Sequence, residues 1–366
     1  MQSNEYMMAR QPIEEKLLSF LRFFEKQQEE ISFNNVTEVQ ERLQGATADL
    51  FPQLTTALAA LAPPEQQKDY HNKLSEVIAR FQGATAKVLS GRGRQFAEAF
   101  LAARQEYCQG LYLLYEIRAQ LPGLQSYWVL PEALPALTAL ETKVEGTDAP
   151  VGFTHKGRTD THTAYTLYAP ENYSPQQTWP LIVCLHGGYG HNDEYIWTWL
   201  RSAKSKGYLL LSPKSTGPTW SVLNPPVDVG SIRAMLDDVC ATYAVDRKRV
   251  YLSGLSDGGM FAYMLGLSCP DWFAGIAPIA GELHPMTDPM LRQKQGKDVP
   301  LFIVHGAKDF IFDVRSVRSS CELLQKIGYN VTYTELPEWG HAYTYSINEQ
   351  LVLPWFASLG GVGQRA

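Results

Sequence analysis

The chain has 366 residues, a length that favours two domains over one. Its hydrophobic fraction of 45% is typical of a globular protein, and its net charge of −6 argues against nucleic-acid binding, which usually needs a basic face. No basic stretch followed by an apolar one opens the chain, and no apolar run is long enough to span a bilayer, so we expect neither a signal peptide nor a membrane span. The five cysteines are widely spaced and form no metal-binding pattern, which favours a reducing, cytoplasmic location.

Residues 1–145 have the periodicity of amphipathic helices. Apolar side chains recur at helical spacing in two segments, at Ile13, Leu17, Phe20, Leu21 and Phe24, and at Phe96, Phe100, Ala103, Tyr107, Leu111 and Leu114. Pro63-Pro64 and Gly91–Gly93 predict breaks between helices. EVQERLQGATADL at residues 38–50 returns as EVIARFQGATAKV at residues 76–88, with eight of thirteen residues identical at an offset of 38, about the length of a helical hairpin.

We interpret residues 1–145 as an α-helical bundle domain with two candidate roles. One role is packing or oligomerisation, for example in a homodimer formed through these helices. The other role is that of a lid over an active site in the second domain. Large apolar residues such as Phe23, Tyr112 and Trp128 exceed what one narrow packing stripe needs, and such residues often mark an interface. The sequence leaves both roles open.

Residues 146–366 alternate between strand and helix patterns. Apolar runs predict strands at residues 164–170, 180–188, 208–213, 249–254, 273–281, 300–306 and 330–337. The central runs are continuously apolar, as expected for parallel strands that are buried on both faces. Between them lies at least one amphipathic helix, with a face made of Ile232, Met235, Leu236, Val239, Cys240 and Tyr243. This order predicts an α/β domain with a mostly parallel sheet and helices on both faces, and a site at the carboxyl ends of the strands.

The pentapeptide GLSDG at residues 254–258 joins a predicted strand to a predicted helix. It fits the G-x-S-x-G pattern, in which a sharp turn exposes a serine at the top of the sheet and at the N-terminus of a helix. Bulky neighbours would clash in such a turn, so Gly254 and Gly258 suit their positions. Ser256 is therefore our candidate nucleophile, and a simple capping serine is the alternative.

A serine hydroxyl needs a base, and the base needs a carboxylate that orients it. In this class of sites both residues follow the serine, in the order Ser, Asp or Glu, His. Asp309 ends a strand 53 residues after Ser256, and His341 follows the last strand 32 residues later. Asp313 is the rival carboxylate, but it falls where the next helix begins. His305 lies inside the strand end and is interpreted as structural.

An oxyanion hole needs backbone N–H groups that face the developing negative charge. One donor should be the N–H of Asp257, directly after the nucleophile. The other should come from the loop after the strand at 180–188, where Gly188 or Tyr189 is our candidate. His186 in the same loop is expected to brace it through hydrogen bonds rather than to react. Tyr189 and Trp220 are candidates for a substrate pocket, with ordinary loop packing as the alternative.

The stretches YTLYAPENY, PLIVCLHGG, GLSDGG, HGAKD and GHAY together resemble α/β-hydrolase serine esterases. The resemblance is to the phospholipase/carboxylesterase family, with feruloyl-esterase and polyhydroxybutyrate-depolymerase-like relatives, and it covers roughly residues 150–360. It implies an α/β-hydrolase fold, with Ser256, Asp309 and His341 as the triad. Secreted depolymerases of this kind have signal peptides and disulfides, and neither is expected here. The N-terminal helices have no counterpart in the minimal family fold, which weakens any inference about the substrate.

The sequence therefore predicts a serine hydrolase that cleaves carboxylic esters through an acyl-enzyme. The expected substrate is a small-molecule ester, and the expected chemistry needs no cofactor and no metal. A thioesterase, an acyltransferase or a serine peptidase would use the same triad and stays an alternative. A non-catalytic hydrolase-like binding protein is the alternative from another class, although such proteins commonly lose a member of the triad.

Overall fold

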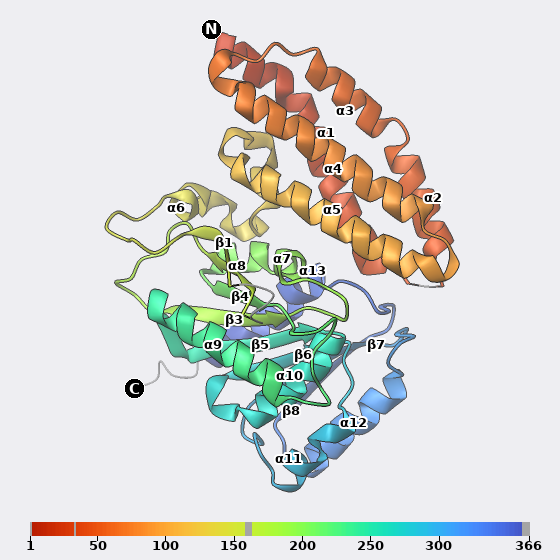
Figure 1. Ribbon diagram of the computed structural model, residues 1–366, viewed down its shortest axis with the longest axis vertical. Coiled ribbons are helices and arrows are strands. Elements are labelled where there is room, and N and C mark those ends of the chain that lie inside the picture. The colour runs from red at the N-terminus through yellow and green to blue at the C-terminus, as the bar shows by residue number, and fades with distance from the viewer. Residues whose placement is uncertain (1, 33, 158–162, 361–366) are drawn as a thin grey trace. The chain divides into compact units, whose positions relative to one another are not determined.

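The computed structural model describes residues 2–32, 34–157 and 163–360, and Figure 1 shows their helices and strands. The chain divides into two compact units, Met1–Trp128 and Val129–Ala366. Each unit has its own secondary structure, helical in the first and mixed in the second.

Residues 129–145 belong to the second unit, although their helical character led us to assign them to the helical domain. They form the 3₁₀ segment Pro131–Ala136 and the short helix α6 (Leu137–Glu141). The backbone N–H of Leu130 donates to Ser205 Oγ at 2.7 Å, and Glu141 forms an ion pair with Lys204 at 3.0 Å. These contacts depend on residues far away in the chain, which is why local periodicity does not reveal them.

The first unit consists of five α-helices in the part that the structure describes. They are α1 (Gln2–Glu30), α2 (Val36–Thr47), α3 (Leu50–Ala59), α4 (Lys68–Ser90) and α5 (Phe96–Glu116), followed by 3₁₀ turns at Arg118–Gln120 and Pro122–Tyr127. The predicted breaks at Pro63-Pro64 and Gly91–Gly93 both fall between helices. No helix in the described residues has the length and apolar character needed to cross a bilayer.

The two copies of the repeated sequence fold alike. The first copy lies in α2 as far as Thr47 and the second lies in α4, and equivalent residues are buried in each copy: Val39, Leu43 and Thr47 in α2, and Val77, Phe81 and Thr85 in α4. Both threonine hydroxyls donate to the carbonyl four residues earlier, at 2.7 and 2.9 Å. The repeated sequence therefore gives α2 and α4 the same pattern of buried residues on one helical face.

The second unit is built on an eight-stranded sheet with the order β1-β2-β4-β3-β5-β6-β7-β8. The strands are β1 (Gly152–Lys156), β2 (Tyr165–Ala169), β3 (Trp179–Leu185), β4 (Leu209–Pro213), β5 (Val245–Leu255), β6 (Gly275–Ile279), β7 (Leu301–Gly306) and β8 (Val331–Leu336). β2 pairs antiparallel with β1 and β4, and the pairs from β4 to β8 are parallel. All seven predicted strands are present. β1 was missed because it is short and only partly buried, with a weak alternation.

Helices cover both faces of this sheet. They are α7 (Asn192–Tyr195), α8 (Leu200–Lys206), α9 (Pro226–Thr242), α10 (Asp257–Ser268), α11 (Asp288–Arg292), α12 (Val314–Lys326), α13 (Tyr345–Ile347) and α14 (Leu353–Gly360). Tyr251 and Leu252 are neighbours in β5 and so point to opposite faces. Tyr251 stacks on Phe356 of α14 at 4.6 Å between ring centroids, whereas Leu252 joins a buried cluster with Phe261 of α10. The unit therefore has the α/β-hydrolase fold that the sequence predicts.

Candidate functional site

Ser256 lies at the turn between β5 and α10 in a strained backbone conformation, with φ 59° and ψ −122°. The two flanking glycines make this turn possible. A Cβ at Gly254 would lie 2.2 Å from the Gly258 carbonyl oxygen, and a Cβ at Gly258 would lie 2.5 Å from two carbonyl oxygens of the β3 end. Strain of this kind persists only where the surroundings hold it, and it is common at reactive sites. The predicted strand–turn–helix context of Ser256 is therefore present.

Ser256, His341 and Asp309 form a chain of hydrogen bonds. The Nε2 atom of His341 lies 2.8 Å from Ser256 Oγ, and its Nδ1 atom lies 2.8 Å from Asp309 Oδ2. The three residues follow β5, β8 and β7, so they meet at the carboxyl edge of the parallel strands. In this geometry the ring can accept the serine proton at Nε2 while Asp309 holds the proton at Nδ1.

The Asp309 carboxylate is buried and has partners on both oxygens. Oδ1 accepts the backbone N–H groups of Ile311 and Phe312, at 2.8 and 2.9 Å, and Oδ2 faces His341. Burial by itself would raise the pKa of Asp309, but the hydrogen bond and charge of His341, with the two amides, lower it below its usual value. The carboxylate is thus held as an anion beside the imidazole.

Asp313, the rival carboxylate, does not contact His341. It caps α12, where its Oδ1 accepts the backbone N–H of Arg315 at 2.9 Å, and it pairs with the Arg315 guanidinium. These interactions lower the pKa of Asp313 to about 2. His305 is fully buried in β7, and its Nε2 lies 2.9 Å from the Phe312 carbonyl oxygen, so it braces the turn that carries Asp309.

The loop after β3 lies against the nucleophile, since a Cβ at Gly187 would be 3.4 Å from Ser256 Cβ. The N–H of Tyr189 donates to the Pro218 carbonyl at 2.8 Å, so this residue does not fit the donor role that we considered for it. Within the described part of the chain, the backbone N–H groups of Gly188 and Asp257 have no recorded acceptor. The geometry therefore favours Gly188 and Asp257 as the pair of oxyanion donors.

His186 holds this loop as a neutral imidazole. Its Nδ1 lies 2.7 Å from the Gly187 carbonyl oxygen, and its Nε2 accepts the N–H of Ser215 at 3.2 Å. Burial, and secondarily the charge of Lys214, lower the pKa of His186 to about 3. The structural role predicted for His186 agrees with these contacts.

Trp220 is largely buried, and it lines a cavity next to Asp257 at the start of α10. Its Nε1 donates to the His186 carbonyl at 2.7 Å, and its ring stacks on Phe261 at 5.3 Å. Tyr189 is 70% exposed and lies on the loop after β3. Of the two pocket candidates, Trp220 lines this cavity, whereas Tyr189 presents its side chain to solvent and is not among the residues that line it.

Sequence reasoning missed two polar residues that hold the loop at 215–221. Asp228, fully buried in the first turn of α9, accepts the N–H groups of Thr216 and Ser221, at 2.8 and 2.6 Å. Thr219 donates its hydroxyl to Asp257 Oδ2 at 2.5 Å. An acidic residue in the first turn after Pro225-Pro226 was a visible signal for Asp228, whereas Thr219 had none.

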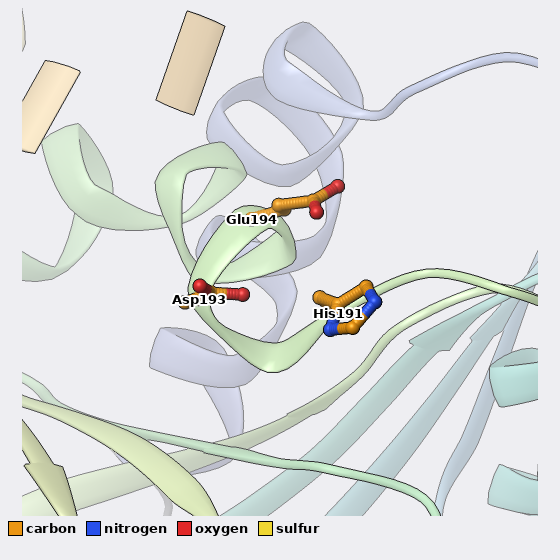
Figure 2. Close-up of side chains that lie close together, drawn as sticks. All are labelled: His191, Asp193 and Glu194. Carbon is orange, nitrogen blue, oxygen red and sulfur yellow. The ribbon is translucent and has the colours of Figure 1, made fainter. Parts of the chain in front are cut away.

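His191, Asp193 and Glu194 lie close together around the start of α7, as Figure 2 shows, with their potential ligand atoms all within 4.8 Å of one another. A nearby cation balances this group. The charges of Glu194 and Asp193 raise the pKa of Lys214 against the larger lowering effect of its burial. Lys214 Nζ also donates to the Gly190 carbonyl at 3.2 Å. The lysine ammonium therefore supplies the positive charge that these carboxylates need, and we assign no metal to them.

Comparison with known proteins relates this chain to ester hydrolases. It is 32% identical over 158 residues to the bifunctional acetylxylan esterase/xylanase XynS20E of Neocallimastix patriciarum, which covers 41% of this chain and 22% of that protein. It is 29% identical over 98 residues to acyl-protein thioesterase 1 of Gibberella zeae, covering 26% and 42%. It is 28% identical over 153 residues to probable feruloyl esterase C of Aspergillus niger, covering 40% and 54%. The chain thus spans about half or less of the length of these relatives.

The match to a protein family lies within the second unit. Residues 229–351 fit the phospholipase/carboxylesterase family, and this stretch contains Ser256, Asp309 and His341. The resemblance drawn from the sequence motifs is thereby confirmed. Residues 229–351, within the α/β fold of the second unit, thus match a phospholipase/carboxylesterase domain.

Proposed function

We propose that this protein is a serine hydrolase that cleaves carboxylic esters through a Ser256 acyl-enzyme. The observation that carries the proposal is the hydrogen-bonded chain from Asp309 through His341 to Ser256, with 2.8 Å at each step. The strained turn at Ser256 supports it, because that turn presents the hydroxyl at the N-terminus of α10, where negative charge is favoured.

In the first half-reaction, His341 Nε2 takes the proton of Ser256 Oγ as the oxygen attacks the ester carbonyl carbon. The carbonyl oxygen becomes an oxyanion, which the N–H groups of Gly188 and Asp257 stabilise. Each such donor typically contributes about 2.7–4 kcal/mol to the transition state. The carbon–oxygen bond to the alcohol then breaks, and His341 returns the proton to the leaving alcohol.

In the second half-reaction, a water molecule repeats the sequence. His341 takes a proton from the water as its oxygen attacks the acyl carbon, and the bond to Ser256 Oγ breaks. His341 then protonates Ser256, which releases the carboxylic acid and restores the enzyme. Throughout, Asp309 keeps the Nδ1 proton in place and stabilises the imidazolium.

The direct test is labelling with a fluorophosphonate probe and hydrolysis of p-nitrophenyl esters. The wild-type protein should be labelled at Ser256 and should hydrolyse short esters, and Ser256→Ala should abolish both. Retained hydrolysis in Ser256→Ala, with the fold intact by circular dichroism, would contradict the mechanism. An intact fold with neither labelling nor hydrolysis in the wild type would favour the binding-protein alternative.

A thioesterase is the second candidate, because acyl-protein thioesterase 1 of Gibberella zeae is among the relatives. The same triad acts on both substrates, which differ in the leaving group. Matched oxygen and thiol esters of one acyl chain, assayed side by side, separate the two activities by the ratio of their kcat/KM values.

For the rest of the chain we propose a lid or oligomerisation role for the helical unit, and a cytoplasmic location. Light scattering on the full chain measures whether it forms a dimer. Removal of the helical unit should change selectivity toward bulky esters if it is a lid, and should change only the oligomeric state otherwise. Cys184, Cys240, Cys269 and Cys321 form no disulfide in the described part of the chain, which fits a reducing compartment and which cell fractionation would test.

A further inference from the structure

A cavity of about 410 Å³ lies beside the proposed oxyanion hole. Its walls come from the loop at 219–224, from the start of α10 and from His284 after β6. Leu223, Val222 and Met260 supply apolar surface, and Leu223 is 77% exposed. A cavity of this size, next to a reactive serine, can hold part of a substrate.

Asp257 is the one Asp, Glu, Lys or Arg among the described residues that line this cavity. His284 also lines it, and its Nδ1 accepts the backbone N–H of Met286 at 3.2 Å. Asp257 is therefore the one carboxylate that the described residues place in the wall of this cavity.

The position of the Asp257 carboxylate is tightly constrained. Oδ2 accepts the Thr219 hydroxyl, and it lies so close to Gly188 that a Cβ on that glycine would be 2.5 Å away. No hydrogen bond to Oδ1 is recorded among the residues that the structure describes. One carboxylate oxygen is thus fixed by Thr219, and the other is left for a ligand.

This arrangement is electrostatically costly for ester hydrolysis by itself. A carboxylate close to Gly188 opposes the negative charge that develops on the substrate oxygen, because like charges repel. A positively charged group in the cavity would offset that repulsion and pair with Oδ1. A second negative charge would add to it.

We propose that the cavity is a subsite for a cationic group of the ester substrate, with Asp257 as the residue that sets charge selectivity. This inference rests on the proposed esterase function. Esters that carry a quaternary ammonium group should be preferred over neutral esters of the same shape, and esters that carry a carboxylate should be disfavoured. If the charged group of the ester lies about 6–8 Å from the Asp257 carboxylate, the cationic ester should have a kcat/KM about tenfold higher than the anionic one.

The test uses two substrate series, because the charged group could lie on either side of the ester bond. The acyl series consists of p-nitrophenyl esters of 5-trimethylammoniopentanoic acid, of its neutral isostere 6,6-dimethylheptanoic acid and of adipic acid. The alcohol series consists of acetate esters of choline, of 3,3-dimethylbutanol and of 4-hydroxybutanoate. In at least one series, the wild-type kcat/KM should fall in the order cationic, neutral, anionic.

Asp257→Asn should reduce the cation-to-anion ratio from about tenfold to less than about threefold, because it removes the charge and keeps an acceptor for Thr219. Asp298→Asn is the matched control. Asp298 is 90% exposed and precedes β7, so it lies at the opposite end of the strands from Ser256. This variant removes the same charge and should keep the wild-type ratio.

If Asp257→Asn does not fold, two other measurements test the inference. They are the cation-to-anion ratio of Asp257→Ser and the salt dependence of that ratio in the wild type. Raising NaCl from 10 mM to 1 M shortens the Debye length from about 30 to about 3 Å, so the ratio should shrink. The inference would be overturned if kcat/KM did not follow the order cationic, neutral, anionic in either series. It would also be overturned if Asp257→Asn or Asp257→Ser kept the wild-type cation-to-anion ratio. Either result would leave the esterase function intact. Absence of all hydrolysis, with Ser256 unlabelled, would overturn the proposed function as well.

Discussion

Both units bury charged side chains, but they use them in different ways. In the helical unit, Arg10 and Glu14 form an ion pair at 2.9 Å with side chains that are 1% and 2% exposed. Glu14 Oε2 also accepts the backbone N–H of Gly123 at 2.8 Å. In the α/β unit, the buried Asp309 carboxylate is linked through His341 to Ser256.

The difference lies in where each chain of hydrogen bonds ends. The Arg10–Glu14 pair ends on other protein groups, so its charges fix how α1 packs and no reactive atom is presented. The Asp309 chain ends on a hydroxyl in a strained turn at the edge of the sheet, where a substrate can reach it. A buried charge by itself therefore does not identify a reactive site. A buried charge whose chain of hydrogen bonds ends on a nucleophile does.

The largest effect should come from Asp309→Asn, which should lower kcat for p-nitrophenyl esters by about 10⁴-fold, because the amide no longer holds His341 in the required tautomer. Asp313→Asn is the matched control and should change kcat by less than about threefold, since Asp313 caps α12 and does not contact His341. Steady-state kinetics on both variants measures the contrast. The opposite ranking would show that the wrong carboxylate has been chosen.

Glu14→Gln should destabilise the helical unit by about 3–5 kcal/mol, because it leaves the buried Arg10 charge without its partner. Glu76→Gln breaks an exposed pair of the same spacing, with Arg80, and should cost less than about 1 kcal/mol. Urea unfolding followed by circular dichroism gives both values. Equal effects would mean that burial does not distinguish the two pairs.

Alanine substitutions at two glycines of the helical unit should change the free energy of unfolding in opposite directions. A Cβ at Gly110 would lie 2.6 Å from the Phe81 ring, so Gly110→Ala should cost about 1–3 kcal/mol where α4 meets α5. A Cβ at Gly45 would meet open space, so Gly45→Ala should stabilise α2 by up to about 1 kcal/mol through helix propensity. Thermal melts of both variants test the signs, and a stabilised Gly110→Ala would contradict the close helix contact.

Acidification should weaken the α/β unit partly through Asp309. The pKa of this carboxyl is lowered in the folded state. Its contribution to stability is therefore complete above the unfolded pKa of about 3.9, and it is lost as the pH falls from there through the lower folded pKa. Asp309→Asn should therefore show a shallower loss of unfolding free energy below about pH 4 than the wild type. Urea titrations at several pH values measure the two slopes, and identical slopes would refute this linkage.

The sequence by itself determined the strands of the parallel sheet, the turn at Ser256, the order Ser, Asp, His and the helical repeat. Each of these is written in local patterns: continuous apolar runs, two glycines around a serine, and polar residues directly after strands. Backbone sterics and hydrophobic periodicity act over a few residues, so such patterns can be read without knowing the fold.

Tertiary structure alone decided the features that join distant segments. Residues 129–145 pack in the second unit, the N–H of Tyr189 is used by Pro218, and Asp228 and Thr219 hold the loop beside Asp257. The contacts of Tyr189 with Pro218 and of Thr219 with Asp257 each join segments that follow different strands, so the partner depends on strand order in the sheet, which no local pattern records. The choice of Gly188 over Tyr189, and the single negative charge in the cavity, follow from those long-range pairings.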